Sequence, residues 1–139
     1  MKILSRGSPM EENRPLLGKR VVVIEDDATV KSAIEATLGD AGAVIVSSFH
    51  QKLDAAILDV RIGRGITSLR VAMRLELRLV PFLFYTGYSQ TFAKPLRYRF
   101  PDCKILPKPL AADQLVDEIV TLLGRKAPGF HESGYRDPQ

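Results

Sequence analysis

The feature that most constrains the fold is a run of β-branched residues followed directly by acids. Residues 21–24 read Val-Val-Val-Ile, and Glu25, Asp26 and Asp27 come next without a spacer. A strand that is apolar on both sides of its pleat is buried on both faces, which is typical of parallel sheets. Ligand sites of such sheets lie beyond the carboxyl ends of the strands, so these acids are the first candidate site residues.

Four more short apolar runs are predicted to be strands, at residues 43–46, 55–58, 82–85 and 104–106. Helices are expected from Asp27 to about residue 38, from about residue 66 to 79, and from about residue 112 to 123. Residues 89–99 are expected to be weakly helical at best, because Pro95 interrupts them. Alternating strands and helices predict an α/β fold with a parallel sheet.

Polar residues occur where four of these strands end. Glu25 and Asp26 follow the first strand, and Asp59 follows the third. Thr86 ends the fourth strand, and Lys108 follows the fifth. Since parallel strands end at one edge of the sheet, all of these side chains are expected to line one pocket.

These residue types suit phosphoryl transfer assisted by a divalent cation. Clustered carboxylates repel one another, and Mg²⁺ relieves that repulsion while needing only one or two direct carboxylate ligands. Asp59 could attack a phosphoryl group and form an acyl phosphate. The Lys108 ammonium and the Thr86 hydroxyl could then contact the phosphoryl oxygens, because such transfer depends mainly on positioning and charge neutralisation.

Four segments together resemble the receiver domain of two-component response regulators: VVVIEDD, AAILDV, FLFYTGYS and ILPKPL, in this order. The resemblance covers about residues 19–124 and is greatest to small stand-alone receivers of bacterial signalling systems. It implies a doubly wound, flavodoxin-like fold with five parallel strands in the order 2-1-3-4-5. It also implies a protein that catalyses its own phosphotransfer but is not a turnover enzyme.

The resemblance also assigns roles to the site residues. Asp59 would be the phosphorylation site, Thr86 the switch hydroxyl and Lys108 the lysine that faces the phosphate. Mg²⁺ would be bound by Glu25, Asp26 and Asp59 and by the backbone carbonyl of Arg61. The phosphoryl donor would be a histidine kinase or a phosphotransfer protein.

The domain is expected to span residues 18–124, between a flexible arm at residues 1–17 and a disordered tail at residues 125–139. That tail is too short for an output domain, so signalling is expected to occur by docking to another protein. The single cysteine, Cys103, and the absence of an apolar run long enough for a membrane span fit the cytoplasm.

Some features depart from the receiver pattern. Only eight residues, 47–54, separate the second and third predicted strands, whereas a crossover with its helix needs at least about 10–12. We therefore predict a loop or a single helical turn there, with the second helix shortened or missing. Part of the sheet face over the first two strands would then be uncovered, and a homodimer or a partner protein would cover it.

Other departures concern the site and the last helix. Arg61 and Tyr88, each two residues beyond a site residue, are expected to screen an acyl phosphate from water and slow its hydrolysis. The last helix begins at Leu110-Ala111-Ala112, with no good capping side chain.

Three other functions compete with the receiver interpretation. A receiver-like module could act in dimerisation or partner binding without phosphorylation. A phosphatase of the haloacid-dehalogenase type would need a second Asp where Arg61 stands. The net charge of +4 and the spacing of Arg70, Arg74 and Arg78 could serve nucleic-acid binding, although a solvated basic surface is the favoured explanation.

Overall fold

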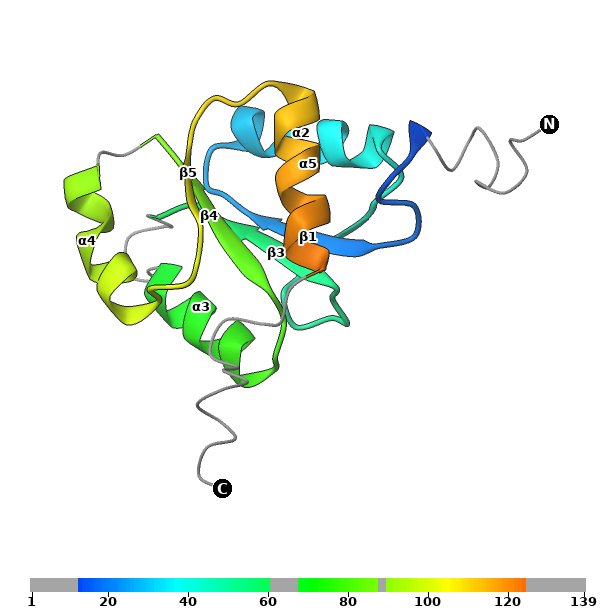
Figure 1. The fold of residues 1–139 in the computed structure, drawn as a ribbon. Helices are drawn as coiled ribbons and strands as arrows, with labels where there is room; N and C mark the ends of the chain where they lie inside the picture. The colour runs from blue at the N-terminus through cyan, green and yellow to red at the C-terminus, as the bar shows by residue number, and fades with distance from the viewer. Residues whose placement is uncertain (1–12, 61–67, 88–89, 125–139) are drawn as a thin grey trace.

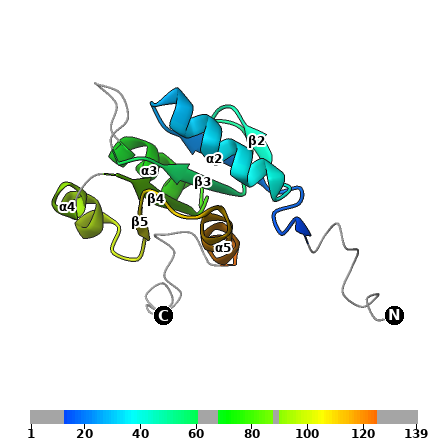
Figure 2. The ribbon, with the colours of Figure 1, turned by 90° about the horizontal axis from the view of Figure 1, so that it is seen from above.

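The computed structural model of the chain describes residues 13–60, 68–87 and 90–124, with residues 90–93 described by their backbone alone. Its centre is a five-stranded parallel sheet with the order β2-β1-β3-β4-β5. The strands are β1 (Arg20–Ile24), β2 (Val44–Val46), β3 (Ala55–Leu58), β4 (Phe82–Thr86) and β5 (Ile105–Pro107). Figure 2 shows β2 and β5 at opposite edges of the sheet. The predicted fold class and strand order are confirmed.

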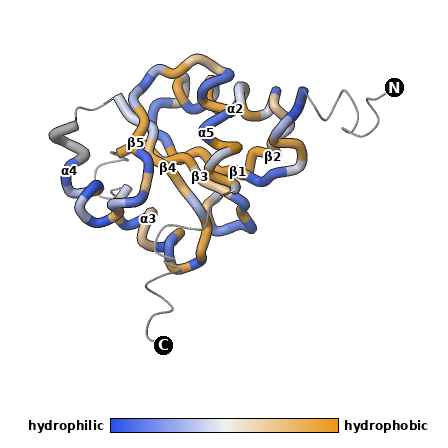
Figure 3. Tube along the Cα trace, in the orientation of Figure 1, coloured by the Kyte–Doolittle hydropathy of each residue, from blue (hydrophilic) through white to orange (hydrophobic). Residues whose placement is uncertain are grey.

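Helices cover both faces of the sheet: α2 (Ala28–Asp40) and α5 (Ala112–Leu123) on one, α3 (Ser68–Leu77) and α4 (Gln90–Arg99) on the other (Figure 1). Alternate residues of β1 face the two layers, since Val21 and Val23 pack with α2 and α5 whereas Val22 packs with α3. The central strands are therefore the most continuously apolar part of the chain (Figure 3). None of the described helices has the length and hydropathy needed to cross a membrane.

The residues at the N-termini of α2 and α5 cap these helices to different extents. The Asp27 carboxylate caps α2 by accepting hydrogen bonds from the backbone N–H groups of Thr29, at 2.9 Å, and Val30, at 3.1 Å. Ala111 offers α5 no side-chain cap, as predicted. Gln114 partly compensates, because its side-chain oxygen accepts the Ala111 N–H at 3.2 Å.

The expectation that residues 89–99 are barely helical is wrong. Residues 90–99 form α4, with Pro95 inside it. Pro95 is exposed and removes only one helical hydrogen bond, whereas Leu96 and Phe100 are 5% and 2% exposed in the core. The Phe100 ring also meets the Phe82 ring edge-on, with centroids 5.4 Å apart. Burial of these side chains outweighs the local cost of the proline.

The last residues of the expected N-terminal arm are packed against the domain. Leu16 is fully buried, and its N–H donates to the Ala41 carbonyl at 2.8 Å. The Gly18 N–H likewise donates to the Gly42 carbonyl at 3.1 Å. The chain is therefore anchored to the end of α2 before β1 begins.

The second crossover contains no helix, as predicted. Residues 47–54 form a short turn in which the Gln51 N–H donates to the Ser48 carbonyl at 3.2 Å. The loop is fixed at its end, because Asp54 accepts the Arg20 N–H at 2.8 Å and Arg20 Nε donates to the Lys52 carbonyl at 2.9 Å.

The prediction of an uncovered sheet face is wrong for β1 and for the end of β2, although Val44 at the edge of the same face is 43% exposed. Val22 and Val46 are only 1% and 4% exposed, because Phe49 and Leu53 of the crossover loop fold over them. Arg78, just beyond α3, holds this loop by donating to the carbonyls of Phe49 and, at 2.7 Å, of Gln51. The crossover loop, held by Arg78, thus covers these valines in place of a helix.

Candidate functional site

The register of the sheet brings the predicted site residues to one edge. Ile24 pairs with Leu58, so Glu25 and Asp59 are the next residues of neighbouring strands, and the Asp59 N–H donates to the Ile24 carbonyl at 3.0 Å. On the other side, Thr86 pairs with Pro107, and the Lys108 N–H donates to the Thr86 carbonyl at 2.9 Å. Backbone pairing alone therefore places these residues together.

Lys108 joins two of the acids. Its ammonium donates to Glu25 Oε1 and lies 3.3 Å from Asp59 Oδ2. The three side chains are largely shielded from solvent, with exposed fractions of 18% for Lys108, 6% for Glu25 and 10% for Asp59. Charge pairs in such a setting are screened by water less than surface pairs are.

The pKa of Lys108 is raised above its ordinary value. Burial acts against the charged ammonium and lowers the pKa, but the hydrogen bond to Glu25 and the charges of Asp59 and Glu25 together outweigh it. Lys108 is therefore a fixed cation at neutral pH and does not serve as a base.

Backbone groups orient the carboxylates. Asp59 Oδ1 accepts the Val60 N–H at 2.7 Å, which leaves Oδ2 toward Lys108. Glu25 Oε2 accepts the Asp27 N–H at 3.1 Å while Oε1 accepts from Lys108. The Thr86 side chain is 2% exposed at the end of β4. This edge of the sheet therefore holds the Asp59 carboxylate in a fixed orientation beside the Lys108 ammonium.

Of the predicted residues, the structure brings Glu25, Asp59 and Lys108 into contact and places Asp26 and Thr86 at the same strand ends. Arg61 lies outside the described residues, as does Tyr88. Within the described ranges, no group of three or more His, Cys, Asp or Glu side chains is arranged to hold a metal ion. The oxygen donors still fit Mg²⁺, which takes one or two carboxylates and completes its shell with water.

Tyr85 is a site neighbour that sequence reasoning treated only as part of a strand. Its hydroxyl accepts the Leu110 N–H at 2.8 Å, and its ring centroid lies 5.8 Å from the Lys108 ammonium. It thus fixes the backbone that follows Lys108. The signal available in the sequence was its position directly before Thr86 at a strand end.

No protein-family model matches the chain, and no curated protein matches it. Solved structures do. A response regulator receiver protein from Burkholderia phymatum is 25% identical, with a TM-score of 0.65, over 79% of this chain and 98% of that one. A response regulator receiver protein from Sinorhizobium medicae is 23% identical, with a TM-score of 0.65, over 77% of this chain and 95% of that one.

A third similar structure is the receiver domain of a sensor histidine kinase from Pseudomonas aeruginosa, which contains magnesium in its active-site cleft. It is 18% identical, with a TM-score of 0.68, over 78% of this chain and 99% of that domain. The chain therefore has the fold of a response regulator receiver domain. In this chain the second crossover of that fold carries no helix.

Proposed function

We propose that the protein is a phosphoacceptor of a two-component relay in which Asp59 receives a phosphoryl group from a histidine kinase or a phosphotransfer protein. The observation that carries the proposal is the Asp59 carboxylate, preoriented by the Val60 N–H and 3.3 Å from the Lys108 ammonium. A neutralising cation beside a fixed carboxylate is what phosphoryl transfer demands of a protein.

In the transfer step, an Asp59 carboxylate oxygen attacks the phosphorus of a phosphohistidine. The new O–P bond forms as the P–N bond breaks, and the histidine nitrogen keeps the bonding electron pair. The product is an acyl phosphate, which brings about −1.5 to −2 units of charge to the strand end. Lys108 would neutralise part of that charge, and its raised pKa keeps it protonated to do so.

Glu25, Asp26 and Asp59 would hold Mg²⁺ together with the backbone carbonyl of Arg61, which lies outside the described residues. When bound, Mg²⁺ supplies positive charge to the phosphoryl oxygens. Glu25 could join this shell while it still pairs with Lys108, since each of its carboxylate oxygens accepts one hydrogen bond and has a second lone pair.

The buried Thr86 hydroxyl would read out the new charge by moving toward it, and a partner protein in the cytoplasm would respond by docking. The crossover loop covers Val22 and Val46 of the sheet face predicted to form a homodimer, so little of that face is left for a dimer contact. The slow hydrolysis expected from Arg61 and Tyr88 concerns residues outside the described ranges.

Intact mass spectrometry after incubation with Mg²⁺ and acetyl phosphate tests the proposal. The wild type and a matched control, Asp40→Asn at the exposed end of α2, should both gain one phosphoryl mass. Asp59→Asn should gain none, and omitting Mg²⁺ should abolish the gain. An adduct that persists in Asp59→Asn would assign the phosphoryl group to another residue.

A module that binds partners without phosphorylation is the second candidate. It is favoured by one observation, that Lys108 already pairs with Glu25, one of the carboxylates that would bind Mg²⁺. A wild type that gains no adduct from acetyl phosphate and shows no Mg²⁺-dependent beryllofluoride binding would refute the first function and favour this one.

A further inference from the structure

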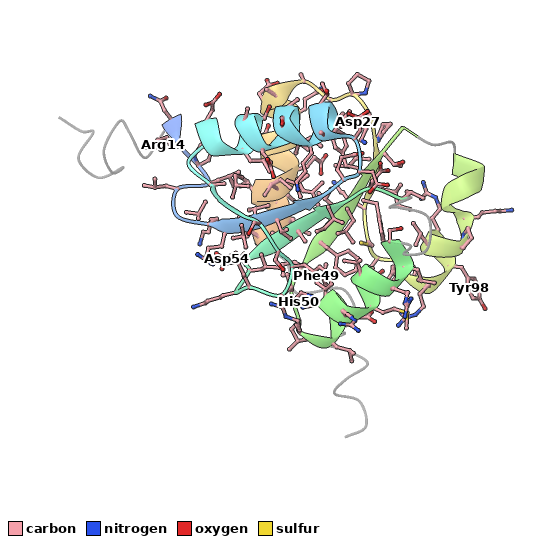
Figure 4. All side chains as sticks on the ribbon, turned by 180° about the vertical axis from the view of Figure 1, so that it is seen from behind. Arg14, Asp27, Phe49, His50, Asp54 and Tyr98 are labelled. Atoms are coloured by element: carbon pink, nitrogen blue, oxygen red, sulfur yellow. The ribbon has the colours of Figure 1, made fainter. Side chains whose placement is uncertain are left out.

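The crossover loop and α3 enclose a surface pocket of about 290 Å³. It is lined by Phe49 and His50 from the loop and by Arg70, Val71 and Arg74 from α3. In Figure 4, Phe49 and His50 lie beside α3 on the face of the sheet opposite α2 and α5. The pocket exists because a loop takes the place of the second helix.

Two arginines line the rim of the pocket. Arg70 and Arg74 are exposed and one helical turn apart, and neither guanidinium makes an ion pair or hydrogen bond with another described residue. Arg78 follows in the same stripe, but its guanidinium donates to the loop carbonyls. Within the part of the chain that the structure describes, Arg70 and Arg74 are therefore available to bind an anionic ligand.

The inner side of the pocket is apolar and fixed. Val71 is 4% exposed, and Phe49 packs partly against the core. The Phe49 and His50 rings stack with centroids 4.3 Å apart and planes 30° apart. The Arg78 hydrogen bond to the Phe49 carbonyl holds this stacked pair opposite the two arginines.

We propose that this pocket docks a short acidic segment of a partner protein, independently of Asp59 phosphorylation. Carboxylates of the segment pair with Arg70 and Arg74, since the guanidinium fork matches a carboxylate with two parallel hydrogen bonds. One apolar side chain of the segment enters beside Val71 and the Phe49–His50 stack, where a buried anchor contributes most of the binding free energy.

The geometry favours such a segment over nucleic acid. Binding to DNA draws its affinity from many contacts between basic side chains and phosphates, whereas only two arginines are among the described residues that line this pocket.

Fluorescence anisotropy tests the proposal with a labelled acidic octapeptide that contains one phenylalanine, titrated with the full chain at physiological salt. The charge reversal R70E/R74E should weaken binding at least about tenfold. The matched double variant K19E/K94E changes the net charge equally at two exposed lysines elsewhere and should stay within about twofold of the wild type. Replacing the peptide's phenylalanine by glycine should also weaken binding.

If the two double variants lost peptide affinity equally, the binding would reflect diffuse charge attraction, and the proposal would be overturned. So would no binding up to about 1 mM peptide, or a single-stranded oligonucleotide binding as tightly as the peptide. Should R70E/R74E unfold, R70Q/R74Q makes the same comparison against K19Q/K94Q. Asp59→Asn should bind the peptide as the wild type does, so failure of phosphorylation and failure of docking are distinguishable.

Discussion

The Lys108 ammonium lies 3.3 Å from Asp59 Oδ2, although the two residues are 49 positions apart in the chain. The contact depends on the stagger of the strand ends, because β4 continues two residues beyond its last pairing with β3 and β5 pairs with it as far as Pro107, so Lys108 comes after the end of β3. The pairing of the strands therefore holds the ammonium beside the carboxylate.

The raised pKa of Lys108 predicts a specific alkaline behaviour. A group whose pKa is higher in the folded than in the unfolded chain stabilises the fold fully below its unfolded pKa, and this stability is lost as pH rises through the folded pKa. Urea unfolding of the wild type should therefore lose stability above the ordinary lysine value of 10.5. Lys108→Met should lack this loss.

The control is Lys104→Met, which removes a surface ion pair to Glu118 with exposed fractions of 44% and 27%. It should retain the alkaline loss, since exposed pairs contribute little to stability. Identical alkaline profiles for the wild type and Lys108→Met would contradict the assignment to Lys108.

Arg78→Gln should destabilise the domain by about 1 kcal/mol, because it removes charge-assisted hydrogen bonds to the loop. Arg70→Gln is the matched control and should change stability by less than about 0.5 kcal/mol. Thermal unfolding measures both. An Arg78→Gln variant as stable as Arg70→Gln would show that the loop covers the sheet without this side chain.

Leu16→Ala should cost about 2–5 kcal/mol, as expected for a fully buried leucine. Leu17→Ala, at a leucine that is 44% exposed, should cost far less. Denaturant unfolding of the two variants compares them directly. Equal, small effects would place residue 16 in a loose arm after all.

Gly42→Ala should destabilise the domain by more than about 1 kcal/mol. Gly42 has a φ of 101°, and an added Cβ would lie 2.7 Å from Leu17 Cα. Gly39→Ala, inside α2 with nothing within 4 Å of an added Cβ, should be neutral or stabilising. If both variants unfold at the wild-type denaturant midpoint, the close approach at Gly42 is not a constraint.

Much of the fold could be predicted because each buried strand is marked by a short apolar run in the local sequence. The run at residues 21–24 and the other apolar runs identified all five strands to within one residue or so. Glu25, Asp59 and Lys108 could be placed together because parallel strands end at a shared edge, and the structure confirms their contact.

The failures share a physical cause. Pro95 lowers local helix propensity, but the burial of Leu96 and Phe100 depends on residues far away in the chain. Likewise, a short crossover correctly predicted the missing helix, but nothing near residues 47–54 indicated that Arg78 would hold the loop down. Non-local packing decided both outcomes.

The helix-free crossover also bears on how this domain moves. A helix protects its amides through its own hydrogen bonds, whereas residues 47–54 lack a helical ladder and depend on Arg78, on the partly buried Phe49 and on the buried Leu53. Detaching one guanidinium would let this segment open and admit water to Val22 and Val46 while the sheet stays paired. The crossover loop is thus suited to opening while the rest of the domain stays folded. Its amide hydrogens should therefore exchange faster than those of the central strands.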